Sequence, residues 1–167
     1  KSPLALKELK SLHQEWMANP KFIRLHGEHY LEVLYMINYC GIQCGDFEFV
    51  SMAYADKSNQ LLNDSILTIN FEAYRFLALS RIFNKTANYQ AVKHLLYTSK
   101  NKIAEWEPFL NMDINRTLQL SSGISFFVLE DYDHALSFIK GAVTYITAGI
   151  RKELFSVGQM LLLLITY

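Results

Sequence analysis

The chain has 167 residues, 51% of them hydrophobic and 19% charged, with a formal net charge of +0. This composition excludes a disordered chain. The equal numbers of acidic and basic residues argue against nucleic acid or an anionic membrane as a partner, because binding to either needs a surplus of basic residues.

The remaining bulk features predict a cytoplasmic protein. Two cysteines, Cys40 and Cys44, are too few for a disulfide framework, and the first residues do not resemble a signal peptide. The longest purely apolar run, Met160 to Ile165, is far shorter than the roughly 20 residues that span a membrane. Because the chain ends inside this run, we expect it to be a piece of a longer protein.

Apolar residues at helical intervals and few helix breakers predict about eight helices and no strands. Asn19-Pro20 ends the first helix, Gly45-Asp46 forms a turn, Asp64 or Ser65 caps a later helix, and a further helix stops before Pro108. The predicted helices cover residues 4–17, 22–44, 47–62, 66–83, 89–106, 112–129, 132–147 and 151–167.

Three of the predicted turns are alike. Each has a polar residue followed by an aromatic residue that opens a helix, and these aromatics are Phe47, Tyr89 and Tyr132. Their spacing is 42 and then 43 residues, which indicates an internal repeat. In the third unit, Gly123 lies nine residues before the aromatic, Phe126 six before it and Ala135 three after it. This pattern predicts a close helix contact at Gly123.

These positions resemble the tetratricopeptide repeat, in a degenerate form and with a longer period than the usual 34 residues. Asn38, Gly41 and Val50 depart from the family pattern in the first unit, and Val92 departs in the second. A narrower likeness, to uncharacterised bacterial proteins with such arrays, rests on residues 19–20 with 30–31, 129–132, and 151–154 with 162–167.

The resemblance implies an all-α fold, a right-handed α-α superhelix of stacked antiparallel hairpins. We expect one domain over residues 1–167, with hairpins at about 22–62, 66–106 and 112–148. Residues 4–17 and 151–167 would be partial units. The apolar terminal helix predicts a possible homodimer.

In this family the first helix of each hairpin lines a concave face that binds partner peptides. The resemblance therefore implies a binding site on that face. The candidate residues are Tyr35, Tyr39, Gln43, Tyr74, Arg81, Asn84, Lys85 and Phe127. The alternative, that these aromatic residues only pack helix on helix, stays open.

No other constellation predicts chemistry. His26 and His29 lie one helical turn apart, but no third metal ligand is identifiable, and surface histidines are the favoured interpretation. Glu130, Asp131 and Asp133 are interpreted as helix-capping residues. We therefore predict no catalytic residues, no metal and no cofactor.

Two functions follow from the resemblance. The first is a protein-interaction scaffold that binds a protein or peptide on its concave face, without catalysis. The alternative is a regulatory sensor array that holds a short peptide or small ligand.

Overall fold

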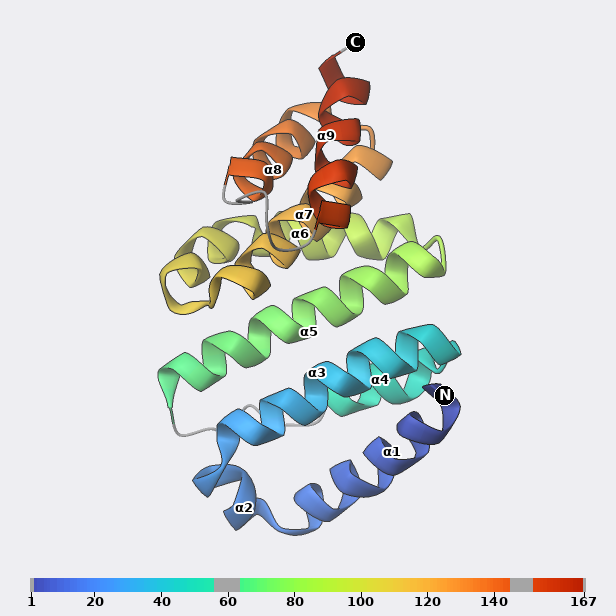
Figure 1. Cartoon of the computed structure of the whole chain (residues 1–167), viewed down its shortest axis with the longest axis vertical. Coiled ribbons are helices and arrows are strands. Elements are labelled where there is room, and N and C mark those ends of the chain that lie inside the picture. Colours follow the sequence, from blue (N-terminus) through green and yellow to red (C-terminus); the bar gives the residue numbers. More distant parts are fainter. Residues whose placement is uncertain (1, 56–63, 145–151, 167) are drawn as a thin grey trace. The chain divides into compact units, whose positions relative to one another are not determined.

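The computed structural model describes residues 2–55, 64–144 and 152–166, and these ranges contain nine α-helices, one short 3-10 helix and no strand. The predicted all-α class is confirmed (Figure 1). The helices are α1 (Ser2–Ala18), α2 (Pro20–Leu25), α3 (Gly27–Cys44), α4 (Phe47–Ala55), α5 (Ser65–Lys85), α6 (Tyr89–Trp106), η2 (Glu107–Phe109), α7 (Met112–Val128), α8 (Tyr132–Thr144) and α9 (Lys152–Thr166).

Several helix ends lie where the sequence predicts them. Asp64 caps α5, its carboxylate accepting from the backbone N–H of Ile66 at 2.6 Å. Asn111 caps α7 in the same way, accepting from the N–H of Ile114 at 2.9 Å. The predicted helical residues 56–62 and 145–147, together with residues 151 and 167, lie outside the described part of the chain.

The single helix predicted from Phe22 to Cys44 is wrong, because the chain breaks between α2 and α3. His26 lies between them with φ −131° and ψ 42°, outside the helical region. Gly27 follows it, buried, and glycine costs about 1 kcal/mol relative to alanine in a helix interior. The break therefore falls beside one of the two glycines of the segment, Gly27, whereas α3 continues through the other, Gly41.

The three predicted turns have the same backbone geometry. The residue two positions before each aromatic adopts a left-handed conformation, with φ 74° at Gly45, 52° at Ala87 and 60° at Glu130. The next backbone N–H then donates to a carbonyl five residues earlier, at 2.9, 2.9 and 3.0 Å. This is the hydrogen bond that closes a helix end of the Schellman type.

The residue before each aromatic caps the helix that follows. The side chains of Asp46, Asn88 and Asp131 accept from the backbone N–H three residues on, at 3.3, 3.2 and 3.4 Å. One local structure therefore recurs at intervals of 42 and 43 residues. The superhelical stacking of the units stays a prediction.

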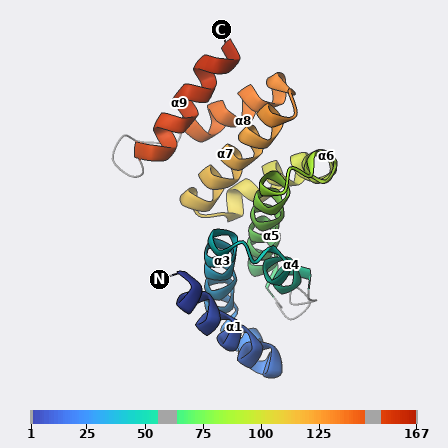
Figure 2. The ribbon, with the colours of Figure 1, turned by 90° about the vertical axis from the view of Figure 1, so that its right-hand side faces the viewer.

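Contacts group the chain into two compact units, Lys1–Ile82 and Phe83–Tyr167, and the boundary falls inside α5. In the first unit α1 packs on α3 and α3 packs on α4. Figure 2 shows α3 between α1 and the start of α5. The core of this unit includes Ile23, Tyr30, Leu34, Ile37, Val50, Ala53 and Phe71.

In the second unit each helix packs on the next, from α6 through α7 and α8 to α9. Its core includes Leu96, Ile103, Leu118, Phe126, Ala135, Ile139 and Ala142. Gly123 lies at a close approach of α7 and α8, because a Cβ atom there would meet Ile139 Cγ1 at 2.5 Å. The predicted close contact at Gly123 thus has a specific partner on α8.

Candidate functional site

The five predicted site residues in the first unit come from two helices and form what we call the tyrosine surface. They are Tyr35, Tyr39 and Gln43 on α3 and Tyr74 and Arg81 on α5. The rings of Tyr35 and Tyr74 are in contact, with centroids 5.4 Å apart and planes tilted by 46°. The structure therefore brings together two residues that are 39 positions apart in the sequence.

The other three residues lie on the same side of this ring contact. Tyr39 and Gln43 follow Tyr35 by one and two helical turns, and Arg81 follows Tyr74 by two turns. Because α3 and α5 run in the same direction (Figure 1), all three lie towards the C-terminal ends of the two helices. Tyr39 is 54% exposed, so its ring is available to a ligand.

The local environment raises the pKa of two tyrosine hydroxyls at this surface and beneath it, those of Tyr74 and Tyr54. Burial raises the pKa of Tyr74, and the nearby Tyr35 and Glu32 raise it further. Burial also raises the pKa of Tyr54 well above its ordinary value, Tyr74 adds to this, and Arg81 opposes it. Raised pKa values leave these hydroxyls as neutral hydrogen-bonding groups at any physiological pH.

The remaining predicted site residues, Asn84, Lys85 and Phe127, belong to the second unit. Asn84 Nδ2 donates to Ser125 Oγ at 2.8 Å, which ties the end of α5 to α7. Phe127 packs edge-on against Tyr132, with ring centroids 5.7 Å apart. Asn84 and Phe127 thus take part in packing within this unit, while Lys85 is exposed.

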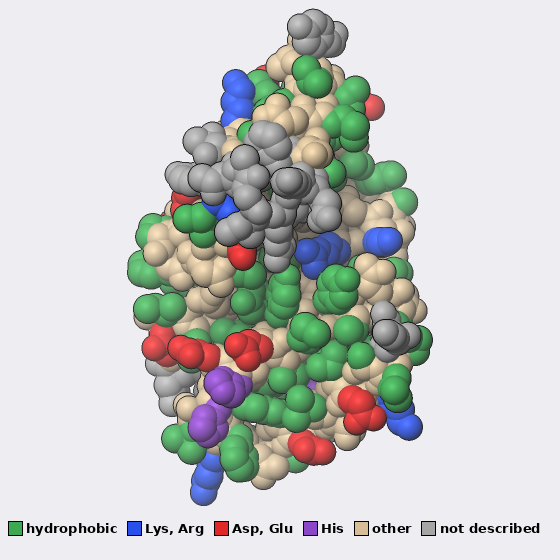
Figure 3. Space-filling model, in the orientation of Figure 1, with side chains coloured by type: hydrophobic (Ala, Val, Ile, Leu, Met, Phe, Trp, Pro, Cys, Tyr) green, Lys and Arg blue, Asp and Glu red, His purple; other side chains and the backbone are tan. Residues whose placement is uncertain are grey.

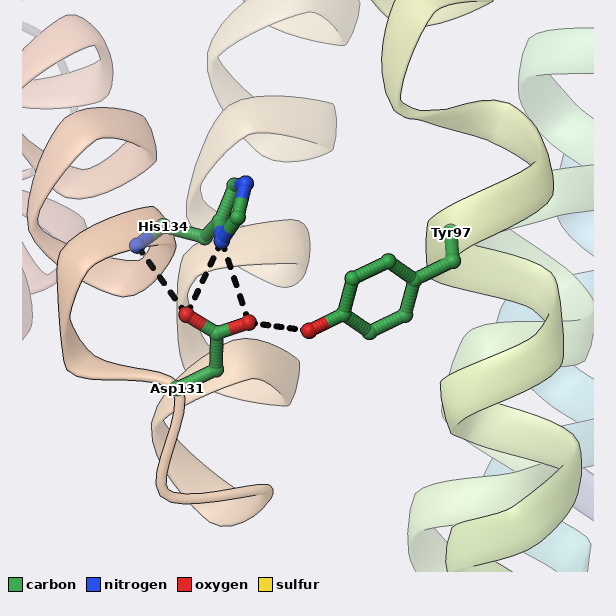
Figure 4. Close-up of polar contacts among 3 residues, drawn as sticks. All are labelled: Tyr97, Asp131 and His134. Carbon is green, nitrogen blue, oxygen red and sulfur yellow. Dashed lines mark hydrogen bonds and ion pairs between the residues drawn. The ribbon is translucent and has the colours of Figure 1, made fainter.

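The second unit also holds a polar cluster that the sequence analysis missed (Figure 4). Asp131, the capping residue of α8, accepts from the Tyr97 hydroxyl of α6 through Oδ2 and contacts His134 Nδ1 at 2.9 Å through Oδ1. The His134 ring stacks on Phe126 with centroids 5.0 Å apart. Tyr97 precedes Asp131 by 34 residues, and no local motif joins them.

This Tyr97–Asp131–His134 cluster holds Asp131 in its charged form. Burial acts to raise the pKa of Asp131, but hydrogen bonds from Tyr97 and His134 outweigh burial and lower it. The same hydrogen bond is the first cause of the raised pKa of Tyr97. The cluster links α6 to the turn between α7 and α8, and a neutral His134 would donate through Nδ1 and leave Nε2 as an acceptor.

His26 and His29 lie side by side, with ring centroids 6.2 Å apart. Figure 3 shows histidine side chains next to acidic ones on one face of the molecule. Among the described residues, no group of three His, Cys, Asp or Glu side chains has the geometry to bind a metal ion. The described helices also include none that is long and apolar enough to cross a membrane.

Comparison of the chain with protein-family models, with curated proteins and with solved structures found no significant match. The resemblance to tetratricopeptide repeats therefore stays a prediction, supported by the residues and turn geometry of this chain alone.

Proposed function

We propose that this chain is a tetratricopeptide-like array of helical hairpins that binds a protein or peptide partner through the tyrosine surface. The recurrence of one turn geometry at Gly45, Ala87 and Glu130 supports the array. The parallel course of α3 and α5 also supports it, because first helices of successive hairpins run in the same direction in stacked arrays.

The contact between the Tyr35 and Tyr74 rings is the observation that carries the binding proposal. Two packed rings have lost most of their side-chain freedom before a ligand arrives, so a partner that stacks on them loses little further entropy. Their hydroxyls supply neutral donors and acceptors beside the apolar rings. Tyrosine is accordingly among the residues enriched where binding energy concentrates.

Arg81 specifies the charge of the partner. Its guanidinium makes no ion pair with any residue that the structure describes, and it is half-buried on α5. A guanidinium pairs with a carboxylate through two parallel hydrogen bonds. We therefore expect the partner segment to carry an Asp, a Glu or a free C-terminus next to an aromatic or aliphatic residue.

The test is a selection of peptides from a displayed random library on the immobilised full chain. Selected peptides are then measured by calorimetry against wild type and two double variants. The test variant carries Tyr39→Ala and Arg81→Glu. The matched control carries Tyr89→Ala and Lys93→Glu, which remove another exposed tyrosine and reverse another cationic side chain on α6.

We expect acidic peptides to be selected, and to bind the control variant like wild type and the test variant at least tenfold more weakly. Equal binding to both variants would place the site elsewhere and refute the proposal. Failure to select any peptide would favour the alternative function, a regulatory sensor that binds a small ligand. Circular dichroism melts of both variants check that the fold is retained.

The other expectations from the sequence stay predictions. These are the cytoplasmic location, the absence of catalysis, and the absence of nucleic-acid and membrane partners. Dimerisation through the terminal helix is one more, and α9 supports it by exposing Met160, Leu163 and Leu164. Light scattering on wild type and on a Leu163→Glu, Leu164→Glu variant would test it.

A further inference from the structure

A small pocket lies in the first unit where α1 ends and α2 begins, far along the sequence from the tyrosine surface. It has a volume of about 290 Å³ and is lined by Glu15, Trp16, Asn19 and Phe22. Asn19 and Pro20 lie where α1 ends and α2 begins, and Figure 1 shows the chain turning there. No prediction from the sequence concerned this pocket.

Two aromatic rings form its walls, and each contacts a neighbouring ring. Trp16 stacks on Tyr30 with centroids 5.6 Å apart, and Tyr30 is fully buried. Phe22 stacks on His26 at 6.4 Å and is itself 56% exposed. The pocket therefore presents two aromatic rings, that of Trp16 backed by a buried ring and that of Phe22 open to solvent.

Glu15 and Asn19 offer side-chain oxygen acceptors, and the Asn19 amide also keeps one N–H donor. Asn19 Nδ2 donates to the Glu15 carbonyl oxygen at 3.0 Å, which leaves Asn19 Oδ1 for another donor. The Glu15 carboxylate forms no ion pair with any described residue. Lys21, although adjacent to Phe22 in the chain, does not line the pocket.

Aromatic faces attract cations through the negative charge of their π systems, and a carboxylate and an amide oxygen accept from cationic N–H groups. We propose that this pocket binds the cationic end of an arginine or lysine side chain presented by a partner polypeptide. Its volume is at the lower limit of about 300–1,000 Å³ for small-molecule sites, which suits one side chain.

An uncharged apolar side chain fits these walls less well, because it would cover the Glu15 carboxylate without pairing it. The proposal uses none of the residues of the tyrosine surface. Failure of one proposal would therefore leave the other unaffected.

The experiment is an NMR titration of the full chain, observed at the indole N–H signals. The chain has two tryptophans, Trp16 in the pocket and Trp106 buried in the other unit, so Trp106 is an internal control. The probes are N-acetyl-arginine amide, N-acetyl-lysine amide and N-acetyl-citrulline amide at constant ionic strength. Citrulline has nearly the shape of arginine without its charge.

We expect the cationic probes to shift the Trp16 signal in a saturable way, leave Trp106 in place, and bind at least tenfold more tightly than citrulline amide. Equal affinity for the citrulline probe would overturn the proposal, since the pocket would then have no preference for charge. Absence of a Trp16 shift at 50 mM of either cationic probe would overturn it as well.

Two variants that each remove one negative charge distinguish a local binding site from a general electrostatic effect of the helix. Glu15→Gln should weaken binding of the arginine probe at least fivefold, whereas Glu8→Gln, an exposed position two turns earlier on α1, should leave it unchanged. Equal weakening by both variants would contradict the proposal. Phe22→Leu keeps the apolar wall but removes a π face, and it should weaken the cationic probes more than citrulline amide.

Discussion

The contact between α7 and α8 at Gly123 leads to our most specific prediction, that Gly123→Ala destabilises the second unit. A Cβ atom at this position would lie 2.5 Å from Ile139 Cγ1, against about 3.5–4.0 Å for two carbon atoms at optimal separation. It would also lie 3.3 Å from the backbone nitrogen of Ile139 and 3.4 Å from the carbonyl oxygen of Ala135. A rotation of the Ile139 side chain would still leave the close contact with its backbone nitrogen, so α8 must also yield slightly.

The same substitution at Gly141 is the matched control, because its neighbour can yield. A Cβ atom there would meet Gln119 Oε1 at 2.8 Å, and this atom is the end of a flexible, half-buried side chain. Each Gly→Ala change gains about 1 kcal/mol of helix propensity. At Gly123, overpacking costs about 1–3 kcal/mol and opposes this gain. At Gly141, the gain in helix propensity remains without such a cost.

We therefore expect Gly123→Ala to lower stability, Gly141→Ala to raise it, and the two variants to differ by about 2 kcal/mol. For a protein of this size that difference corresponds to about 4–8 °C in Tm. Urea unfolding followed by circular dichroism and by hydrogen exchange of peptides from α7 and α8 would measure it. Both glycines belong to the second compact unit, so the stabilities of the two variants can be compared even if the two units unfold separately.

A double-mutant cycle tests the cause. Ile139→Ala alone should cost about 2–5 kcal/mol by leaving a cavity. In the Gly123→Ala, Ile139→Ala double variant the added methyl group enters that space, so the loss should be smaller than the sum of the single losses. Strict additivity, or equal stability of the two glycine variants, would refute the reasoning from the close contact.

Three further predictions follow from buried or linked polar groups. Tyr54→Phe should cost about 1 kcal/mol in urea unfolding, because the buried hydroxyl donates to the Leu34 carbonyl at 2.9 Å; an unchanged midpoint would contradict this. Asn38→Leu should stabilise the first unit by about 1 kcal/mol, because the amide of this fully buried residue has no hydrogen-bond partner among the described residues; a loss of stability would indicate a role that the structure does not show. The pKa of Asp131 is lower in the folded protein than the ordinary value of about 3.9, so its stabilisation is present above that pH and is lost as the pH falls through the folded-state pKa. An acid titration of Tyr97→Phe should show a smaller loss of stability below pH about 4 than wild type, and identical curves would refute the link.

The repeat shows how much a local pattern can predict. The sequence places an aromatic residue after a polar one at 47, 89 and 132, and the structure gives each of these turns the same left-handed residue and the same capping bond. Such geometry depends on residues within one turn of each other, so it can be inferred without a tertiary structure. The left-handed Ala87 and Glu130 were not predictable by residue type, because this conformation favours glycine.

The departures from the family pattern have a physical explanation in the packing. In the first sequence repeat, Gly41 and Val50 occupy the positions that the bulky Phe126 and the small Ala135 occupy in the third repeat. A Cβ atom at Gly41 would lie 2.2 Å from Val50 Cγ2, so the small and large residues have exchanged helices while the contact remains close. The family pattern identifies Gly41 and Val50 each as unusual. Only their contact in the structure shows that the small residue at one position compensates for the larger residue at the other.

One helix prediction was wrong, and two features of the structure were not predicted from the sequence. The helix predicted from Phe22 to Cys44 ignored the break at His26, which lies beside Gly27. The Tyr97–Asp131 hydrogen bond joins separate helices, and the pocket beside Trp16 forms where the chain turns. The hydrogen bond depends on how α6 and α8 are placed, because its partners are 34 positions apart. The break and the pocket lie within short stretches of sequence, but their geometry is visible only in the folded chain.

The sequence by itself therefore determined the all-α class, most helix ends and the recurring turns, because each depends on propensity, capping and periodicity within a few residues. Only the tertiary structure decided that Tyr35 meets Tyr74, that Gly123 meets Ile139 and that Tyr97 meets Asp131. Those contacts depend on how helices dock, and docking is set by the summed shapes of many side chains rather than by any one local pattern.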